Sequence, residues 1–324
     1  MAPVTLSHRR THNLLLISKL LSLRDSASPL TLLLDSLEQP ATPLIQEYLR
    51  RAKLSKAHVT LIAFETLKQP EGVDAFVSAR RKSAGDIFKE VGAAYQPAAA
   101  TNPSRRHLII IDSINPLLNS KRADPGFHLP SFLSSFLAPT SPSAPKAGAS
   151  LVVTYHQDVP ETPPQNPYSP APLSVLTYLA TSIITLHSFA HILAQKAARD
   201  RSLAAPVFGL DEEQDGVLLG RSDKLVGTRT AEGIVLELEH RRKSGRGVLE
   251  WYLLPPESRY SPQQVKEVVT LLDDNPLYNP PTEPDRDAGD EEPAIDQGDG
   301  PGEGGRILYD MGEEDDFDEE EDEI

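Results

Sequence analysis

The chain has 324 residues, 39% of them hydrophobic, which is enough for one large α/β domain or two smaller domains with a substantial core. It has no cysteine, which excludes a disulfide framework, a thiolate nucleophile and a zinc knuckle. No apolar run approaches the roughly 18 residues of a membrane span. We therefore expect a soluble intracellular protein without a membrane segment.

The formal net charge of −15 is unevenly distributed along the chain. Residues 279–324 hold 20 of the 47 acidic residues and two of the 32 basic ones, a net charge of −18. The remaining 27 acidic and 30 basic residues give 1–278 a net charge of +3. The body of the protein is nearly neutral, and the acidity belongs to the tail.

The N-terminal region alternates between helical and strand patterns. The helical segments repeat apolar residues every three or four positions, whereas the strands are short apolar runs. The expected elements are a short helix over 13–24, a strand at 30–34, a helix with Thr42 as N-cap and Pro43 at its first position, a strand at 59–64 and a helix over 72–92.

The chain is organised around residues 107–113, His-Leu-Ile-Ile-Ile-Asp-Ser, in which four consecutive apolar residues lead into Asp112. An uninterrupted apolar run rich in β-branched residues predicts burial on both faces, as in a central strand of a parallel sheet. Asp112 follows at the carboxyl end of this strand, which is where P-loop NTPases hold the Mg²⁺ of a bound nucleotide.

The glycine-rich loop of an NTPase, G-x-x-x-x-G-K-[ST], is missing. Backbone N–H groups wrap phosphates only where no Cβ intervenes, so this loop should follow the first strand. The first glycine is Gly72, and residues 35–43 contain neither glycine nor lysine. Asp112 has two interpretations: a metal ligand, or a cap on the turn at 113–115. We favour the cap.

The second half continues the alternation of strands and helices, which implies βαβ crossovers and a mostly parallel sheet. The expected elements are a helix over 127–137, a flexible loop at 138–145, a strand at 151–155, a helix over 173–180, a strand at 183–186, a hairpin of strands 233–240 and 247–254, and a helix opened by the capping box Ser261-Pro-Gln-Gln264. Residues 157–172 hold six prolines and predict an exposed extended loop. Beyond Asn279 the Pro, Gly, Asp and Glu content predicts disorder.

Few side chains qualify as candidate sites. His187 and His191 have a metal-binding spacing, but no third ligand is nearby in sequence, so structural histidines are the simpler interpretation. No G-x-S-x-G elbow for a serine nucleophile occurs. The hairpin turn carries a dense group of cations: Arg241, Arg242, Lys243 and Arg246. This group predicts contacts to RNA phosphates, with a solubilising turn as the alternative.

The acidic tail has three interpretations. It is a segment that docks on a partner, a mimic of nucleic-acid charge, or a solvating appendage, and the last is the default for a run of like charges.

Three segments resemble the Elongator complex protein 5 family. They are Ser174-Val-Leu-Thr-Tyr-Leu-Ala-Thr-Ser-Ile-Ile-Thr-Leu, His240-Arg-Arg-Lys-Ser-Gly-Arg-Gly-Val and Tyr309-Asp-Met-Gly-Glu-Glu-Asp-Asp-Phe-Asp-Glu-Glu-Glu-Asp. A looser resemblance covers most of 1–278. It implies a RecA-like fold without a functioning nucleotide loop, and a ring of two copies each of subunits four, five and six that binds tRNA. Acetyl and radical chemistry would belong to another subunit.

We therefore expect an α/β protein with a RecA-like, mostly parallel central sheet flanked by helices. Residues 1–278 would form this domain, which lacks a Walker A loop and ends in a C-terminal β-hairpin, and 279–324 a disordered acidic tail. The resemblance implies a non-catalytic, cytoplasmic and nuclear subunit of Elongator that supports modification of the wobble uridine U34 of tRNA. Its partners would be subunits four and six, the catalytic Elongator subcomplex and tRNA. No catalytic, cofactor-binding or metal-binding residue is expected.

Two other classes of protein stay open. The first is a ring NTPase whose nucleotide sites are shared between subunits, with Asp112 on the metal. The second is an acidic-tailed scaffold or histone chaperone, in which the tail would be the active surface.

Overall fold

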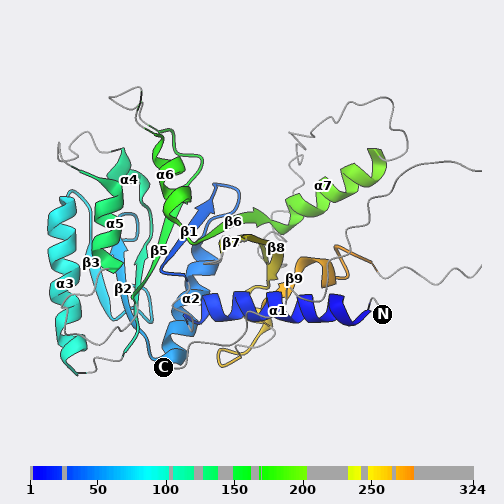
Figure 1. Ribbon diagram of the computed structural model, residues 1–324, viewed down its shortest axis with the longest axis horizontal. Helices are drawn as coiled ribbons and strands as arrows, with labels where there is room; N and C mark the ends of the chain where they lie inside the picture. The colour runs from blue at the N-terminus through cyan, green and yellow to red at the C-terminus, as the bar shows by residue number, and fades with distance from the viewer. Residues whose placement is uncertain are drawn as a thin grey trace, which may run out of the picture. The chain divides into compact units, whose positions relative to one another are not determined.

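The computed structural model describes residues 3–23, 28–101, 105–119, 127–137, 149–161, 168, 170–202, 233–241, 247–264 and 268–280 (Figure 1). The loop expected at 138–145 and all of the expected tail beyond Pro280 lie outside these residues. None of the described helices is long and apolar enough to span a bilayer.

The described elements alternate along the chain as βαβ units do. The helices are α1 Pro3–Leu21, α2 Thr42–Ser55, α3 Ala84–Thr101, α4 Asn115–Leu118, α5 Leu129–Leu137, α6 Pro172–Leu179 and α7 Phe189–Ser202, with short 3₁₀ turns η1 Glu257–Arg259 and η2 Leu272–Asp274. The strands are β1 Leu30–Asp35, β2 His58–Ala63, β3 Ala75–Ser78, β4 His107–Ile111, β5 Ala149–His156, β6 Ser182–Ser188, β7 Ile234–Arg241, β8 Gly247–Leu254 and β9 Thr270–Leu271.

The strands form a single sheet in the order β3-β2-β4-β5-β1-β6-β7-β8-β9. The first six strands of this order, β3, β2, β4, β5, β1 and β6, pair in parallel. Strands β7, β8 and β9 follow in antiparallel pairing. The expected mostly parallel sheet flanked by helices is confirmed, and so is the C-terminal hairpin of β7 and β8.

Apolar layers cover both faces of the parallel strands, which is why their sequences are apolar without alternation. One layer contains residues of α1 and α2, including Leu21 and Leu44, and the other contains residues of α3, α5 and α6, including Ile87, Phe132 and Leu176. Helix α7 packs Phe189 and Ile192 in a third cluster with Val235 of β7 and Leu253 of β8. Strand β4 is buried at every residue, as predicted.

The prediction of one helix over 72–92 is wrong. Gly72 has a φ of +87°, and Ala75–Ser78 extend beside β2 as the strand β3. Helix α3 begins only at Ala84, because the Ser83 hydroxyl accepts the backbone N–H of Asp86 as an N-cap does. Residues 75–78 form a strand because they pair with the edge of β2 and bury Val77. This tertiary pairing overrides the helical spacing of the apolar residues.

The helix predicted from Ser261 is also wrong. Residues 261–264 are not helical, and 265–267 lie outside the described residues. The buried Val268 and Val269 lead into β9, which pairs with Tyr252 and Leu253 of β8. Pairing with an available strand edge replaced the helical hydrogen bonds. At the other end of the chain, the first helix is longer than expected, Pro3–Leu21 instead of 13–24. The N-cap of α2 is Ala41 and not Thr42.

Candidate functional site

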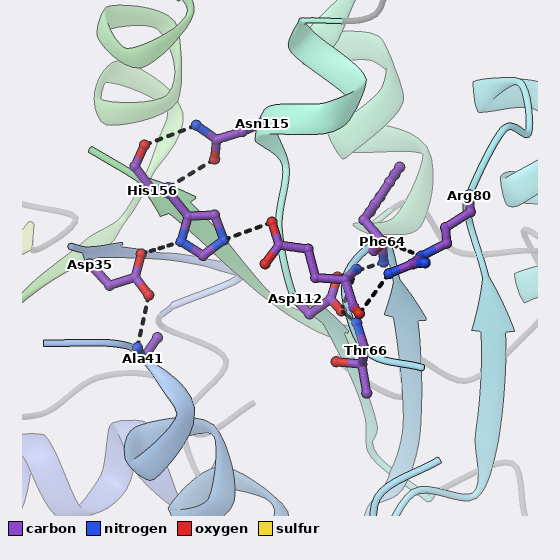
Figure 2. Close-up of polar contacts among 9 residues, drawn as sticks. Asp35, Ala41, Phe64, Thr66, Arg80, Asp112, Asn115 and His156 are labelled. Atoms are coloured by element: carbon purple, nitrogen blue, oxygen red, sulfur yellow. Dashed lines mark hydrogen bonds and ion pairs between the residues drawn. The ribbon is translucent and has the colours of Figure 1, made fainter. Parts of the chain in front are cut away.

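The carboxyl ends of β1, β2, β4 and β5 meet at one edge of the sheet, where open α/β sheets place ligands (Figure 2). Asp35 ends β1 and is 3% exposed. Its Oδ2 accepts the backbone N–H of Ala41 at 2.8 Å, which closes the loop between β1 and α2 onto the strand that precedes it. In the same loop the Leu37 N–H donates to the carboxylate of Asp158. These backbone donors, which a phosphate loop would direct at a nucleotide, are used inside the protein.

Asp112, at the end of β4, is turned toward the neighbouring strand. Its Oδ1 accepts the N–H of Phe64 at 2.7 Å, and its Oδ2 accepts the N–H groups of Glu65 at 3.1 Å and Thr66 at 2.7 Å. Asp112 thus has a structural role, but it caps the loop after β2 and not the turn at 113–115. The guanidinium of Arg80 fastens the same loop by donating to the carbonyls of Phe64 and Glu65.

His156, the last residue of β5, joins these two parts of the edge (Figure 2). Its Nδ1 donates to Oδ1 of Asp35 at 2.5 Å, and its Nε2 lies 3.4 Å from the Glu65 carboxylate. The hydrogen bond to Asp35 raises the pKa of His156, and burial opposes this effect. The Asn115 side chain fixes the His156 backbone through two hydrogen bonds of 2.8 and 2.9 Å.

This arrangement does not fit a bound nucleotide and its Mg²⁺. The loop after β1 has no glycine and no lysine, and the carboxylates of Asp35 and Asp112 are engaged by groups of the protein itself. Within the described residues no group of three or more His, Cys, Asp or Glu side chains is placed to hold a metal ion. The geometry of the edge serves to lock loops together.

Asp35, His156 and Asn115 were not among the site residues predicted from the sequence. Asp35 and His156 carried the same signal as Asp112, a polar residue at the carboxyl end of a buried strand. Their pairing was not visible, because β1 and β5 are neighbours only in the folded sheet.

The hairpin turn is described only at its first cation. Arg241 ends β7 opposite Gly247, and its side chain is 39% exposed. Its Nη1 donates to the carbonyl of Thr177 at 2.6 Å, near the end of α6, and its Nε donates to Glu239 at 3.0 Å. The Arg241 guanidinium is thus hydrogen-bonded within the fold, and its contact with RNA stays a prediction. Arg242, Lys243 and Arg246 lie outside the described residues, and their contact with RNA stays a prediction.

The two histidines with metal-like spacing have separate partners. His187 lies on β6 with its Nε2 3.0 Å from the Glu237 carboxylate. His191 lies on α7, where its Nδ1 is 3.3 Å from Glu38 and its Nε2 accepts from Gln195 at 2.8 Å. The structure brings each ring to a different carboxylate.

Comparison with known proteins assigns the family. A family model described as Elongator subunit Iki1 matches residues 16–310. The chain belongs to this family. It is thus an Elongator subunit, as the resemblance of three segments predicted.

Two curated relatives are both Elongator complex protein 5 from yeasts. The protein of Saccharomyces cerevisiae is 27% identical over 334 aligned positions, which cover 96% of this chain and 97% of the relative. The protein of Schizosaccharomyces pombe is 30% identical over 230 aligned positions, covering 69% of this chain. That second match spans 65% of the relative's length.

The fold is RecA-like, as predicted from the resemblance. Strand β5 is inserted between β1 and β4, with β2 beyond β4 and β6 on the other side of β1. Solved structures similar to this chain include the ATPase domain of G40P (13% identical, covering 70% of this chain and 81% of that chain, TM-score 0.39). Another is the flagellar accessory protein FlaH from Methanocaldococcus jannaschii (11% identical, covering 71% of this chain and 86% of that chain, TM-score 0.38).

Proposed function

We propose that this Elongator subunit is non-catalytic and forms a hetero-hexameric ring with subunits four and six. The ring binds tRNA, joins the catalytic Elongator subcomplex and supports modification of the wobble uridine U34. Cytoplasm and nucleus are the compartments in which we expect it. The acidic residues 279–324 act as a solvating tail.

The observation that carries this proposal is the closed carboxyl edge of the sheet. An NTPase of this fold needs donors for phosphates and a free carboxylate for Mg²⁺. Here the Asp112 carboxylate accepts three backbone N–H groups, and Asp35 is bound to Ala41 and His156. With its own edge closed, the domain works through the surfaces it presents to neighbouring subunits and to RNA.

Assembly is tested by mixing the full-length chain with Elongator subunits four and six and measuring the mass of the product. We expect a species with two copies of each subunit. A chain that remains a monomer in the mixture contradicts the ring. Titration calorimetry with ATP, on the chain alone and on the ring, separates this proposal from an NTPase with shared sites, because tight binding only in the ring favours the NTPase.

RNA binding is tested by changing Arg242, Lys243 and Arg246 to glutamate. Arg241 is left unchanged, since its guanidinium is bonded within the fold. Loss of phosphate contacts should weaken tRNA binding and reduce its salt slope by about 0.7 to 0.9 for each contact. A matched variant with Lys56, Lys68 and Lys89, which are exposed elsewhere on the domain, changed to glutamate controls for net charge. Equal tRNA affinity of the two variants would show that the turn is a solvated loop.

Removal of residues 279–324 tests the remaining alternative. A ring subunit still assembles without its acidic tail, whereas an acidic-tailed chaperone loses its binding activity.

A further inference from the structure

Strand β8 is covered on its outer side along only part of its length. It pairs with β7 from Gly247 to Leu254, but its other neighbour, β9, pairs only with Tyr252 and Leu253. Strand pairing stops directly after β9, because the turn η2 begins at Leu272, although Leu272 still packs near Trp251. Among the described residues, no strand lies along the outer edge of Gly247–Trp251.

The register of the sheet shows which backbone groups point outward there. The Arg241 N–H donates to the Thr181 carbonyl, which lies on the β6 side of β7. Backbone groups of successive residues in a strand point to opposite sides, so the N–H and C=O groups of His240 and Leu238 point toward β8. Their partners Val248 and Glu250 therefore use their backbone groups on β7. It follows that the backbone groups of Gly247, Leu249 and Trp251 face outward.

One of these outward donors is satisfied by a side chain instead of a strand. The Trp251 N–H donates to Oε1 of Glu250 at 3.3 Å. Beyond that pair, Leu249 presents an apolar side chain that is 59% exposed at the same edge.

Soluble proteins usually protect such an edge with lysine, proline or a bulge, because unpaired N–H and C=O groups recruit another strand. Residues 247–251, Gly-Val-Leu-Glu-Trp, contain neither lysine nor proline, and their register with β7 has no bulge. A hollow of about 190 Å³, lined by Trp251, Leu272 and Lys196 among others, lies where the edge emerges from under η2. Among the residues that the structure describes, this edge is thus unpaired, carries the exposed apolar side chain of Leu249 and adjoins a recess.

We propose that the outer edge of Gly247–Trp251 is a docking site for an extended segment of a protein partner, which adds a strand to β8. The proposal rests on the proposed function in that the partner is another subunit of the assembly. The segment would alternate side chains, so that apolar residues pack beside Leu249 and Trp251 on one face.

The charges at this edge favour a protein over RNA. Glu237 and Glu239 stand opposite Trp251 and Leu249 on the same face of the sheet, with side chains 29% and 44% exposed. Glu239 bonds to Arg241 and Glu237 to His187 through one carboxylate oxygen each. The carboxylates repel phosphates, and their second oxygens can accept a lysine or arginine of a protein segment. A strand also requires donors as well as acceptors to match outward C=O and N–H groups, and phosphate oxygens only accept.

Hydrogen exchange of the Leu249 amide tests the proposal on the full-length chain, measured alone and after assembly with subunits four and six. We expect rapid exchange in the free chain and exchange slowed about ten-fold or more in the assembly. Slow exchange already in the free chain would show that the protein's own residues cover the edge, and would overturn the proposal. Equal, fast exchange in both states would also overturn it.

Two variants provide an independent readout. Leu249→Pro removes an outward N–H and keeps the groups that bond β7, and Leu249→Lys places a charge on the edge in case proline prevents folding. Both should weaken assembly by about ten-fold or more, equivalent to about 1.4 kcal/mol. Leu54→Lys, at a 42% exposed position on α2, is the matched control and should assemble normally. Normal assembly of Leu249→Lys would overturn the docking site and leave the proposed ring standing. Failure of the unaltered chain to assemble would overturn both the proposed function and the docking site.

Discussion

The carboxylate of Asp112, the residue directly after β4, accepts the backbone N–H of Thr66, in the loop after β2, at a distance of 2.7 Å. The same side chain accepts the N–H groups of Phe64 and Glu65. A carboxylate at the position where an NTPase holds its metal ion therefore serves to hold a neighbouring loop. The relationship joins two strands that pair in the sheet but lie more than forty residues apart in the chain.

Replacing Asp112 by alanine should destabilise the protein. The change leaves three partly covered N–H groups without an acceptor, and such groups cost about 1–3 kcal/mol when water cannot replace the bond. Because this loop is partly exposed, we expect a total loss of about 2–4 kcal/mol in the free energy of unfolding, measured with urea. Asp158→Ala, which removes a single exposed bond to the Leu37 N–H, is the control and should cost less than about 1 kcal/mol. Unchanged stability of Asp112→Ala would contradict the structural role.

Glu47 is the centre of a buried ionic group that should matter more for stability than any surface pair. It is 1% exposed, and its carboxylate accepts from Arg51 at 2.5 Å and from Arg50 at 2.7 Å. Arg51 is 2% exposed, so Glu47→Ala leaves a buried cation without its carboxylate. We expect a loss of about 3–5 kcal/mol in unfolding free energy. The double variant Glu47→Ala with Arg51→Met should recover part of this unfolding free energy. If the double variant instead loses as much as the sum of the two single variants, the two side chains act independently.

His107 should make the protein sensitive to acid. Burial, followed by the nearby His58, lowers the pKa of His107 from 6.5 to about 3. The ring is held neutral, stacked on Tyr95 at 3.9 Å and hydrogen-bonded to Thr60 at 2.8 Å. Since the unfolded chain binds the proton first, stability is lost as the pH falls from 6.5 toward 3, by about 3 kcal/mol at pH 4 from this residue alone.

His107→Gln removes this titration and keeps a polar group beside Thr60. We expect the difference in unfolding free energy between pH 7 and pH 4 to be smaller in the variant than in the unaltered protein. Carboxylates titrate equally in both proteins, so the comparison isolates His107. An identical pH dependence in the two proteins would mean that the histidine charges without penalty.

Arg241 should contribute to stability as well as to the charge of the hairpin. Its guanidinium donates to the carbonyl of Thr177 near the C-terminus of α6, where a cation also interacts favourably with the helix dipole. Because the side chain is 39% exposed, solvent screening limits the expected loss for Arg241→Ala to about 1 kcal/mol. Arg259→Ala, an exposed arginine on η1, should change stability by less than about 0.5 kcal/mol. Thermal unfolding of the two variants measures this difference. Equal melting temperatures would show that the hydrogen bonds of Arg241 do not stabilise the fold.

The sequence by itself determined the class of fold and the absence of a phosphate loop. An uninterrupted apolar run such as residues 108–111 predicts burial on two faces, and glycine placement is readable without a structure. Strands β1, β2, β4, β5 and β6 and the hairpin of β7 and β8 followed from local pattern, which needs no knowledge of neighbours. Only the tertiary structure decided that residues 75–78 and 270–271 are strands, because each gained its hydrogen bonds from a strand edge formed by distant residues. The pairing of Asp35 with His156, 121 residues away in the chain, and the docking of Arg241 on α6 were likewise beyond the sequence, since both depend on which strands become neighbours when the sheet assembles.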